Sequence, residues 1–164
     1  MPATEKDQFI DVWEREFKTT LKLLKQYPAD KLSLKPAEKS RSAKDLAWTL
    51  VMEEQTLMGG ALKGTFDFQN APKPPATLAE IIYAYENGHK DLVDKVKLLS
   101  DADLNQKVQF FTGPKQMTDM RKADVLWTGI MDTIHHRGQL SVYLRMAGAK
   151  VPSIYGPSAD EPWT

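Results

Sequence analysis

The chain has 164 residues, of which 41% are hydrophobic and 27% charged, and its formal net charge is zero. This length suits one compact domain, residues 1–164, and the balanced charge gives no general attraction to nucleic acid or to an anionic membrane. The absence of cysteine excludes disulfides, thiolate zinc sites and cysteine nucleophiles. No apolar run approaches the length of a membrane span, so we expect a cytoplasmic protein.

The first part of the chain predicts two helices joined by a surface connection. Residues 5–27 carry apolar side chains at helical spacing, with Thr4 as the N-cap. Glu16 falls on the apolar face, where we expect it to lie at the edge and reach solvent. After the charged, proline-containing segment 28–41, a second helix is predicted over 42–62.

This second helix places polar groups among its apolar ones. Glu53 follows Thr49 by one turn, and both lie on the side that carries Leu46. Glu53 can therefore face the core, whereas Glu54 points to a different side and is expected to face water.

A third helix is predicted over 77–99, after the proline-rich loop 69–76. His89 lies in the middle of its apolar stripe. A lone histidine in that position is usually a core residue with satisfied hydrogen bonds, and the alternative is contact with polar groups of the last helix. Residues 100–118 read as a turn, a short amphipathic or extended piece around 108–111, and a second turn.

The last helix is predicted over 119–148, with Gly148 as its C-terminal stop. Asp132, His136 and Gln139 fall inside its apolar face. Burying these three polar groups is unfavourable unless they bond to one another, to a neighbouring helix, to water or to a metal. The complete predicted stripe is Val125, Asp132, His136, Gln139 and Tyr143.

The tail contains three prolines and no helical period, and its apolar residues indicate that it packs back on the helices. Arg137 and Arg145 are expected to form ion pairs, or to support the tail at Asp160 and Glu161. The predicted fold is all-α: a four-helix bundle with a long connection between helices two and three and a C-terminal arm packed on the bundle.

Three segments are similar to a known family: KPAEKSRSAKDLAWTL at the second helix, IHHRGQLSVYLRMAGAK in the last helix and VPSIYGPSADEP in the tail. With this order of helices, the chain resembles the DinB-like family of bacterial four-helix bundles, which is related to thiol transferases and metal-dependent hydrolases. The resemblance implies a nickel or zinc ion on three histidines. Position by position these fall on Thr49, Asp132 and His136, so this chain keeps only one of the three imidazoles.

The departures leave the ligand set open. Asp132 and His136, completed by Glu53 or His89, would make a harder set that tolerates manganese, iron or zinc. If neither residue joins them, metal binding is weak, and Asp132 and His136 form a buried hydrogen-bonded pair. His135 lies around the helix from this pair, and we expect it to support the ligands, to lie at an interface or to face solvent.

Three functions follow from these residues. The favoured one is a small-ligand-binding or stress-related bundle with weak metal binding or none, whose pocket includes Thr49, Gln139 and Tyr143. The second is a divalent-metal-dependent hydrolase or thiol S-transferase. The third is a homodimeric interaction module. The apolar residues expected to be exposed for pairing are Trp48, Trp127, Ile130 and Ile134. The chain lacks a basic groove, so nucleic-acid binding is not expected.

Overall fold

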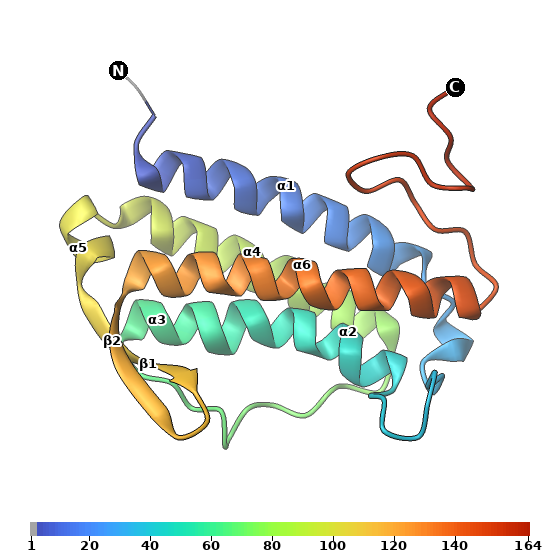
Figure 1. Ribbon diagram of the computed structural model, residues 1–164, viewed down its shortest axis with the longest axis horizontal. Coiled ribbons are helices and arrows are strands. Elements are labelled where there is room, and N and C mark those ends of the chain that lie inside the picture. Colours follow the sequence, from blue (N-terminus) through green and yellow to red (C-terminus); the bar gives the residue numbers. More distant parts are fainter. Residues whose placement is uncertain (1–2) are drawn as a thin grey trace.

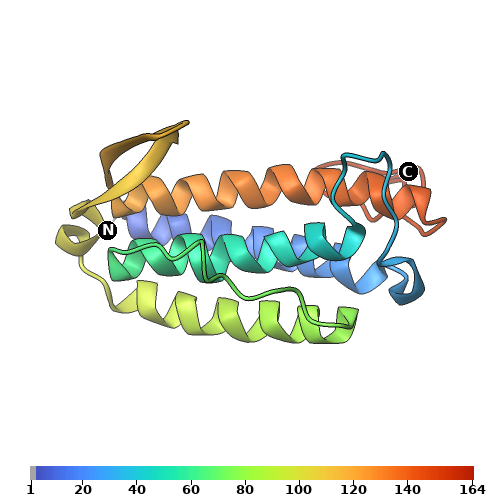
Figure 2. The ribbon, with the colours of Figure 1, turned by 90° about the horizontal axis from the view of Figure 1, so that it is seen from below.

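The computed structural model describes residues 3–164 and is mostly helical, with one small two-stranded sheet (Figure 1). The helical elements are α1 (Glu5–Gln26), the 3₁₀-helix η1 (Ala29–Lys31), α2 (Ala43–Met52), the π-helix η2 (Glu53–Met58), α3 (Gly59–Lys63), α4 (Leu78–Leu98), α5 (Asp101–Asn105) and α6 (Lys122–Met146). The strands are β1 (Lys107–Gly113) and β2 (Gln116–Arg121). Elements α2, η2 and α3 follow one another without a break and form one rod (Figure 2).

The long helices begin and end where their capping residues predict. The Thr4 hydroxyl accepts from the backbone N–H of Asp7 at 3.1 Å. Thr77 and Glu80 form a reciprocal capping box at the start of α4. Gly148 has φ +78°, a left-handed conformation that favours glycine, and it stops the last helix as predicted.

The all-α expectation was wrong at the start of the last helix. Residues 119–121, predicted as helix, belong to β2, and α6 begins only at Lys122. The strands are antiparallel, and Lys107 pairs with Arg121. Val108 and Phe110 alternate with exposed residues and are buried, so packing one face of β1 recruits 119–121 into the hairpin.

The long helical elements of residues 3–164 form four rods: α1, the α2–η2–α3 segment, α4 and α6. Helix α1 contacts α4 and α6, and the α2–η2–α3 rod contacts the same two helices from the other side. The β1–β2 hairpin lies at one end of the rods and the C-terminal arm at the opposite end (Figures 1 and 2).

The apolar core consists of two clusters, one containing Trp13 and Ile130 and the other containing Leu23 and Leu140. Buried polar side chains stand between the clusters in every rod. They are Glu16 and Thr20 of α1, Glu53 and Glu54 of η2, His89 of α4, and Thr133 and Arg137 of α6. We call this set the polar layer.

One part of the polar layer is a buried ion pair. Arg137, 1% exposed, donates from Nη1 to Glu16 Oε2 at 2.6 Å. The Tyr155 hydroxyl of the arm donates to the same carboxylate oxygen at 2.7 Å. Glu16 was therefore wrongly expected to reach solvent, and Arg137 pairs with α1 instead of the acidic residues of the arm.

The arm is held to the helices by further charged contacts, as predicted for Arg145. Arg145 pairs with Asp160 at 2.6 Å, and Lys22 pairs with Glu161 at 2.6 Å. Both pairs are partly exposed, so each contributes little by itself. Within residues 3–164, no helix combines the length and apolar character needed to cross a membrane.

Candidate metal centre

The π-helix η2 determines where two consecutive glutamates point. Its i to i+5 hydrogen bonding widens the turn, so successive side chains are separated by a smaller rotation than in an α-helix. Glu53 is 8% exposed and Glu54 only 1% exposed. The expectation that Glu54 faces water was wrong, because it assumed a regular α-helix through these residues.

Glu53 lies against the middle of α6 and meets two polar side chains there. His136 Nδ1 is 3.5 Å from Asp132 Oδ1 and 3.9 Å from Glu53 Oε1. One potential ligand atom from each of the three residues lies within 4.8 Å of the other two. Among residues 3–164, this is the group of three histidine, aspartate or glutamate side chains that clusters tightly enough to hold a metal ion.

Two atoms of the group lack hydrogen-bond partners. Glu53 Oε2 and His136 Nδ1 are both buried, and no described residue bonds to either of them. A buried polar atom without a partner is strongly unfavourable, and a cation coordinated by both atoms would relieve this. The side chain of Asp132 is 40% exposed, so the group remains reachable from solvent.

The electrostatics of the group also favour a cation. Burial, and then the negative charge of Asp132, raise the pKa of Glu53 to about 8. Burial also lowers the pKa of His136 below its usual value, which favours a neutral imidazole with a free lone pair. Without a cation beside it, the Glu53 carboxyl group therefore keeps its proton at neutral pH.

His89 belongs to a different part of the polar layer. Its Nδ1 lies 3.1 Å from Glu54 Oε2, and Phe17 stacks on its ring with the centroids 3.7 Å apart. Trp13 donates to Glu54 Oε1 at 2.8 Å. His89 is thus buried in the core, as expected, but only its Nδ1 is satisfied, since no described residue forms a hydrogen bond with its Nε2. The structure does not place it with the candidate ligands Asp132 and His136.

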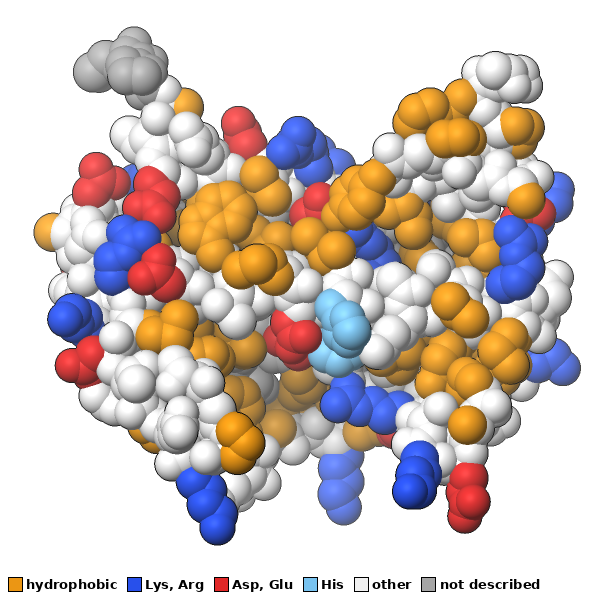
Figure 3. Space-filling view, in the orientation of Figure 1, with side chains coloured by type: hydrophobic (Ala, Val, Ile, Leu, Met, Phe, Trp, Pro, Cys, Tyr) orange, Lys and Arg blue, Asp and Glu red, His pale blue; other side chains and the backbone are white. Residues whose placement is uncertain are grey.

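The other predicted site residues are Thr49, Gln139 and Tyr143, of which Tyr143 is buried. Gln139 is exposed, not on the buried face, and its amide contacts His135 Nε2 at 3.0 Å. Val125 and Tyr143 of the predicted stripe are buried, as expected. Thr133 and Arg137 lie on the buried face of α6 in place of Asp132 and Gln139. Figure 3 shows the face of the molecule seen in Figure 1. Histidine lies at the surface near the middle of this view, with an acidic side chain beside it and basic side chains below.

A cavity of about 570 Å³ adjoins the group. Its lining includes Ser40, Arg41, His135, His136, Gln139 and Tyr143. Thr49 does not line it but accepts a hydrogen bond from Arg41 Nη1 at 2.9 Å. Arg41 was missed in the sequence because it lies in a charged surface connection, where nothing in the pattern distinguishes it from its neighbours.

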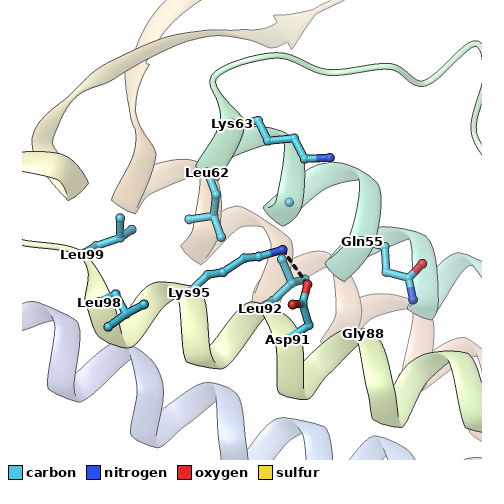
Figure 4. A pocket seen from close by; sticks show the side chains of 10 residues that line it. Gln55, Leu62, Lys63, Gly88, Asp91, Leu92, Lys95, Leu98 and Leu99 are labelled. Atoms are coloured by element: carbon cyan, nitrogen blue, oxygen red, sulfur yellow. Dashed lines mark hydrogen bonds and ion pairs between the residues drawn. The ribbon is translucent and has the colours of Figure 1, made fainter.

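A slightly larger cavity of about 600 Å³ lies between α3 and α4 (Figure 4). Four leucines, including Leu62 and Leu92, form the apolar part of its wall. Of its three charged residues, Asp91 and Lys95 pair with each other at 2.6 Å, and the third is Lys63. Because it contains no cluster of potential ligands, we place the candidate site at the smaller cavity.

Two of the apolar residues expected to be exposed are buried. Trp48 is 9% exposed and donates to the carbonyl oxygen of Pro72, and Ile130 is 2% exposed within the core. Trp127 and Ile134 are partly buried against the same core. The predicted homodimer therefore rests on fewer exposed residues than the sequence indicated.

Comparisons with known proteins agree with this architecture. The model of the DinB family matches residues 1–163. The chain is 28% identical, over 94% of its length and 90% of the relative, to the Bacillus subtilis protein YrdA, which is described as uncharacterized. A DinB-like protein of Bacillus cereus is 28% identical and superposes with a TM-score of 0.76, covering 90% of this chain and 95% of that one.

A second solved structure, the DinB-like protein YjoA of Bacillus subtilis, is 22% identical and shares the fold with a TM-score of 0.73. The alignment covers 90% of this chain and 97% of YjoA. From the match along nearly its whole length, this chain belongs to the DinB family.

Proposed function

We propose that this chain binds one divalent metal ion through Glu53, Asp132 and His136 and uses it to act on a small molecule in the adjoining cavity. The observation that carries the proposal is the convergence of three ligand-type side chains, two of which present buried atoms without hydrogen-bond partners. The sequence alone favoured weak metal binding or none, because two of the three implied histidine positions carry threonine and aspartate. Glu53 supplies the third ligand.

The residue types indicate which metals fit. Two carboxylates and one imidazole form a harder and more negative set than three imidazoles, and such a set suits manganese, iron or zinc better than it suits nickel. Glu53 has to lose its proton when it binds a cation, so we expect metal affinity to increase with pH towards the pKa of about 8.

Three protein ligands leave coordination positions open for a substrate, which is typical of catalytic metal sites rather than structural ones. When bound, a divalent ion lowers the pKa of a coordinated water or thiol and so supplies a nucleophile. The chain's own contribution is to hold the ligands on two rigid helices and to provide the cavity. Hydrolysis or thiol transfer, the activities implied by the family resemblance, are the reactions we propose to assay.

The test is the metal content of purified, untagged protein after exposure to manganese, iron, nickel and zinc, followed by removal of free ions. We expect close to one ion per chain in the wild type and little in His136→Ala. His135→Ala is the matched control, because it removes the adjacent, exposed imidazole and should retain the metal.

Equal loss of metal in both histidine variants, or no retained metal in the wild-type protein, would contradict the proposal. In the second case the group would be a polar network inside the helices, and the function would be ligand binding without metal.

A further inference from the structure

We infer that Arg41 binds the anionic group of the ligand, so that the cavity beside Glu53, Asp132 and His136 accepts small molecules carrying a carboxylate or phosphate. This inference rests on the proposed function, because it assigns a substrate class to the same site. It is carried by the way in which the fold holds Arg41 and by the charge of the cavity wall.

Arg41 is fixed at both its ends. The hydroxyl of Tyr143 on α6 donates to the Arg41 carbonyl oxygen at 3.0 Å, which ties down the backbone. The guanidinium donates from Nη1 to the Thr49 hydroxyl at 2.9 Å, and Thr49 in turn donates to the Asp45 carbonyl oxygen at 2.9 Å. A preorganised guanidinium loses less conformational entropy when it binds an anion than a freely moving one.

The guanidinium of Arg41 is not paired with an acidic side chain among the described residues. Within residues 3–164 it forms no ion pair. No aspartate or glutamate lines the cavity, so Arg41 is the one residue of the wall with a permanent charge. Ser40 and Gln139 add uncharged polar groups next to it. A planar guanidinium with free N–H groups matches a carboxylate or phosphate.

The cavity also has an apolar side, which limits the rest of the ligand. Pro36, Leu46 and Val142 contribute to the wall, so the group attached to the anion can be a short alkyl or aromatic one. His136 lines the same cavity, so a ligand anchored on Arg41 lies beside the proposed metal ligands.

Thr49 has a positioning role in this arrangement. It stands one turn before Glu53, at the position where the family resemblance implies a histidine ligand. Here its short hydroxyl side chain accepts from Arg41 and so holds the guanidinium at the wall of the cavity. Where the resemblance implies a metal-binding imidazole, Thr49 therefore provides a hydroxyl group that positions the guanidinium of Arg41.

The experiment compares three probes by NMR titration of the full chain, both metal-free and loaded with Zn²⁺. Zn²⁺ is used because it is diamagnetic, whereas Mn²⁺ would broaden the signals. The probes are 3-phenylpropionate, phenyl phosphate and the neutral amide of 3-phenylpropionate. We expect at least one anion to bind at least tenfold more tightly than the amide, with shifts centred on Gln139 and Val142. Arg41→Gln should abolish this preference, and Arg41→Lys should retain part of it.

Thr49 is tested by the same titration. Thr49→Val removes the hydroxyl at nearly constant volume and should weaken anion binding severalfold, whereas Thr49→Ser should restore it. Equal binding of the amide and both anions, or undiminished anion preference in Arg41→Gln, would overturn the inference.

Metal binding is measured separately on the same samples, so that the two proposals can fail independently. Retained metal in Arg41→Gln together with lost anion preference supports both. Anion binding that depends on Arg41 in a chain that binds no metal would support the inference while refuting the proposed function.

Discussion

Glu53 is the residue on which the account depends, because it is buried beside Asp132 and has no hydrogen-bond partner for Oε2. A carboxylate in such a place needs either a proton or a cation. In the absence of a cation, Glu53 keeps its proton, and its pKa is raised to about 8. The same residue therefore predicts both metal binding and the behaviour of the metal-free protein.

In metal-free protein, the free energy of unfolding should fall as the pH rises from about 5 to about 8. The folded state keeps the proton on Glu53 up to a pKa of about 8, whereas the unfolded state releases it near the ordinary value of 4.5. Over this window the folded state binds more protons, so stability is lost with rising pH, by as much as about 5 kcal/mol.

Glu53→Gln should remove this dependence, because an amide does not titrate. The measurement is urea denaturation of both proteins in the presence of a chelator between pH 5 and pH 9. Parallel curves for wild type and variant would show that Glu53 ionises normally in the fold.

Thr49→His should strengthen the binding of nickel and zinc by at least about tenfold, since it adds an imidazole one turn before Glu53. Thr49→Val, which adds no ligand, is the control. Competition with a coloured chelator gives the affinities. If the histidine and valine variants bind nickel equally, Thr49 does not face the proposed ligands.

At the scale of the elements, the sequence predicted the long helices well and the irregular segments poorly. Capping residues such as Thr4 and Gly148 act locally, so their effect can be read from neighbouring residues. The π-helix and the β2 strand depend on distant packing, which no local pattern encodes. This is why Asp132 and His136 could be proposed as neighbours from helical spacing, whereas the choice of Glu53 over His89 and the burial of Glu54 could not.

Two adjacent glycines of α3 should respond to substitution in opposite ways. A β-carbon at Gly60 would lie 2.9 Å from the carbonyl oxygen of Thr65 and 2.6 Å from Phe66 Cδ1, so Gly60→Ala should cost about 1–3 kcal/mol. At Gly59 the nearest atoms are 3.6 Å away, and alanine should stabilise the helix by up to about 1 kcal/mol. Chemical denaturation checks both values, and a stable Gly60→Ala protein would contradict the close approach of the loop.

Substitution of two arginines of α6 should lower the stability by very different amounts. Arg137→Met leaves Glu16 buried without its partner and should cost about 3–5 kcal/mol. Arg145→Gln removes a partly exposed pair with Asp160 and should cost less than about 1 kcal/mol. Melting temperatures of the two variants give the comparison, and equal shifts would show that the polar layer does not depend on the buried pair.

At the scale of the whole molecule, the polar layer separates two apolar clusters, and the candidate site lies where this layer reaches the surface beside α6. Apolar packing at both ends can hold the rods rigid while their middle carries charged groups. Membership of the DinB family followed from short sequence segments and extends along nearly the whole chain. The family fold alone does not determine the chemistry, because this chain differs at two of the implied histidine positions.

The most direct test of the central claim is a calorimetric titration of Mn²⁺ into metal-free protein at pH 8, with wild type and Glu53→Gln side by side. We expect one ion per chain for the wild type and at least about tenfold weaker binding for the variant, because the third ligand loses its charge. Equal affinities for the two proteins would contradict the claim that Glu53 completes the site.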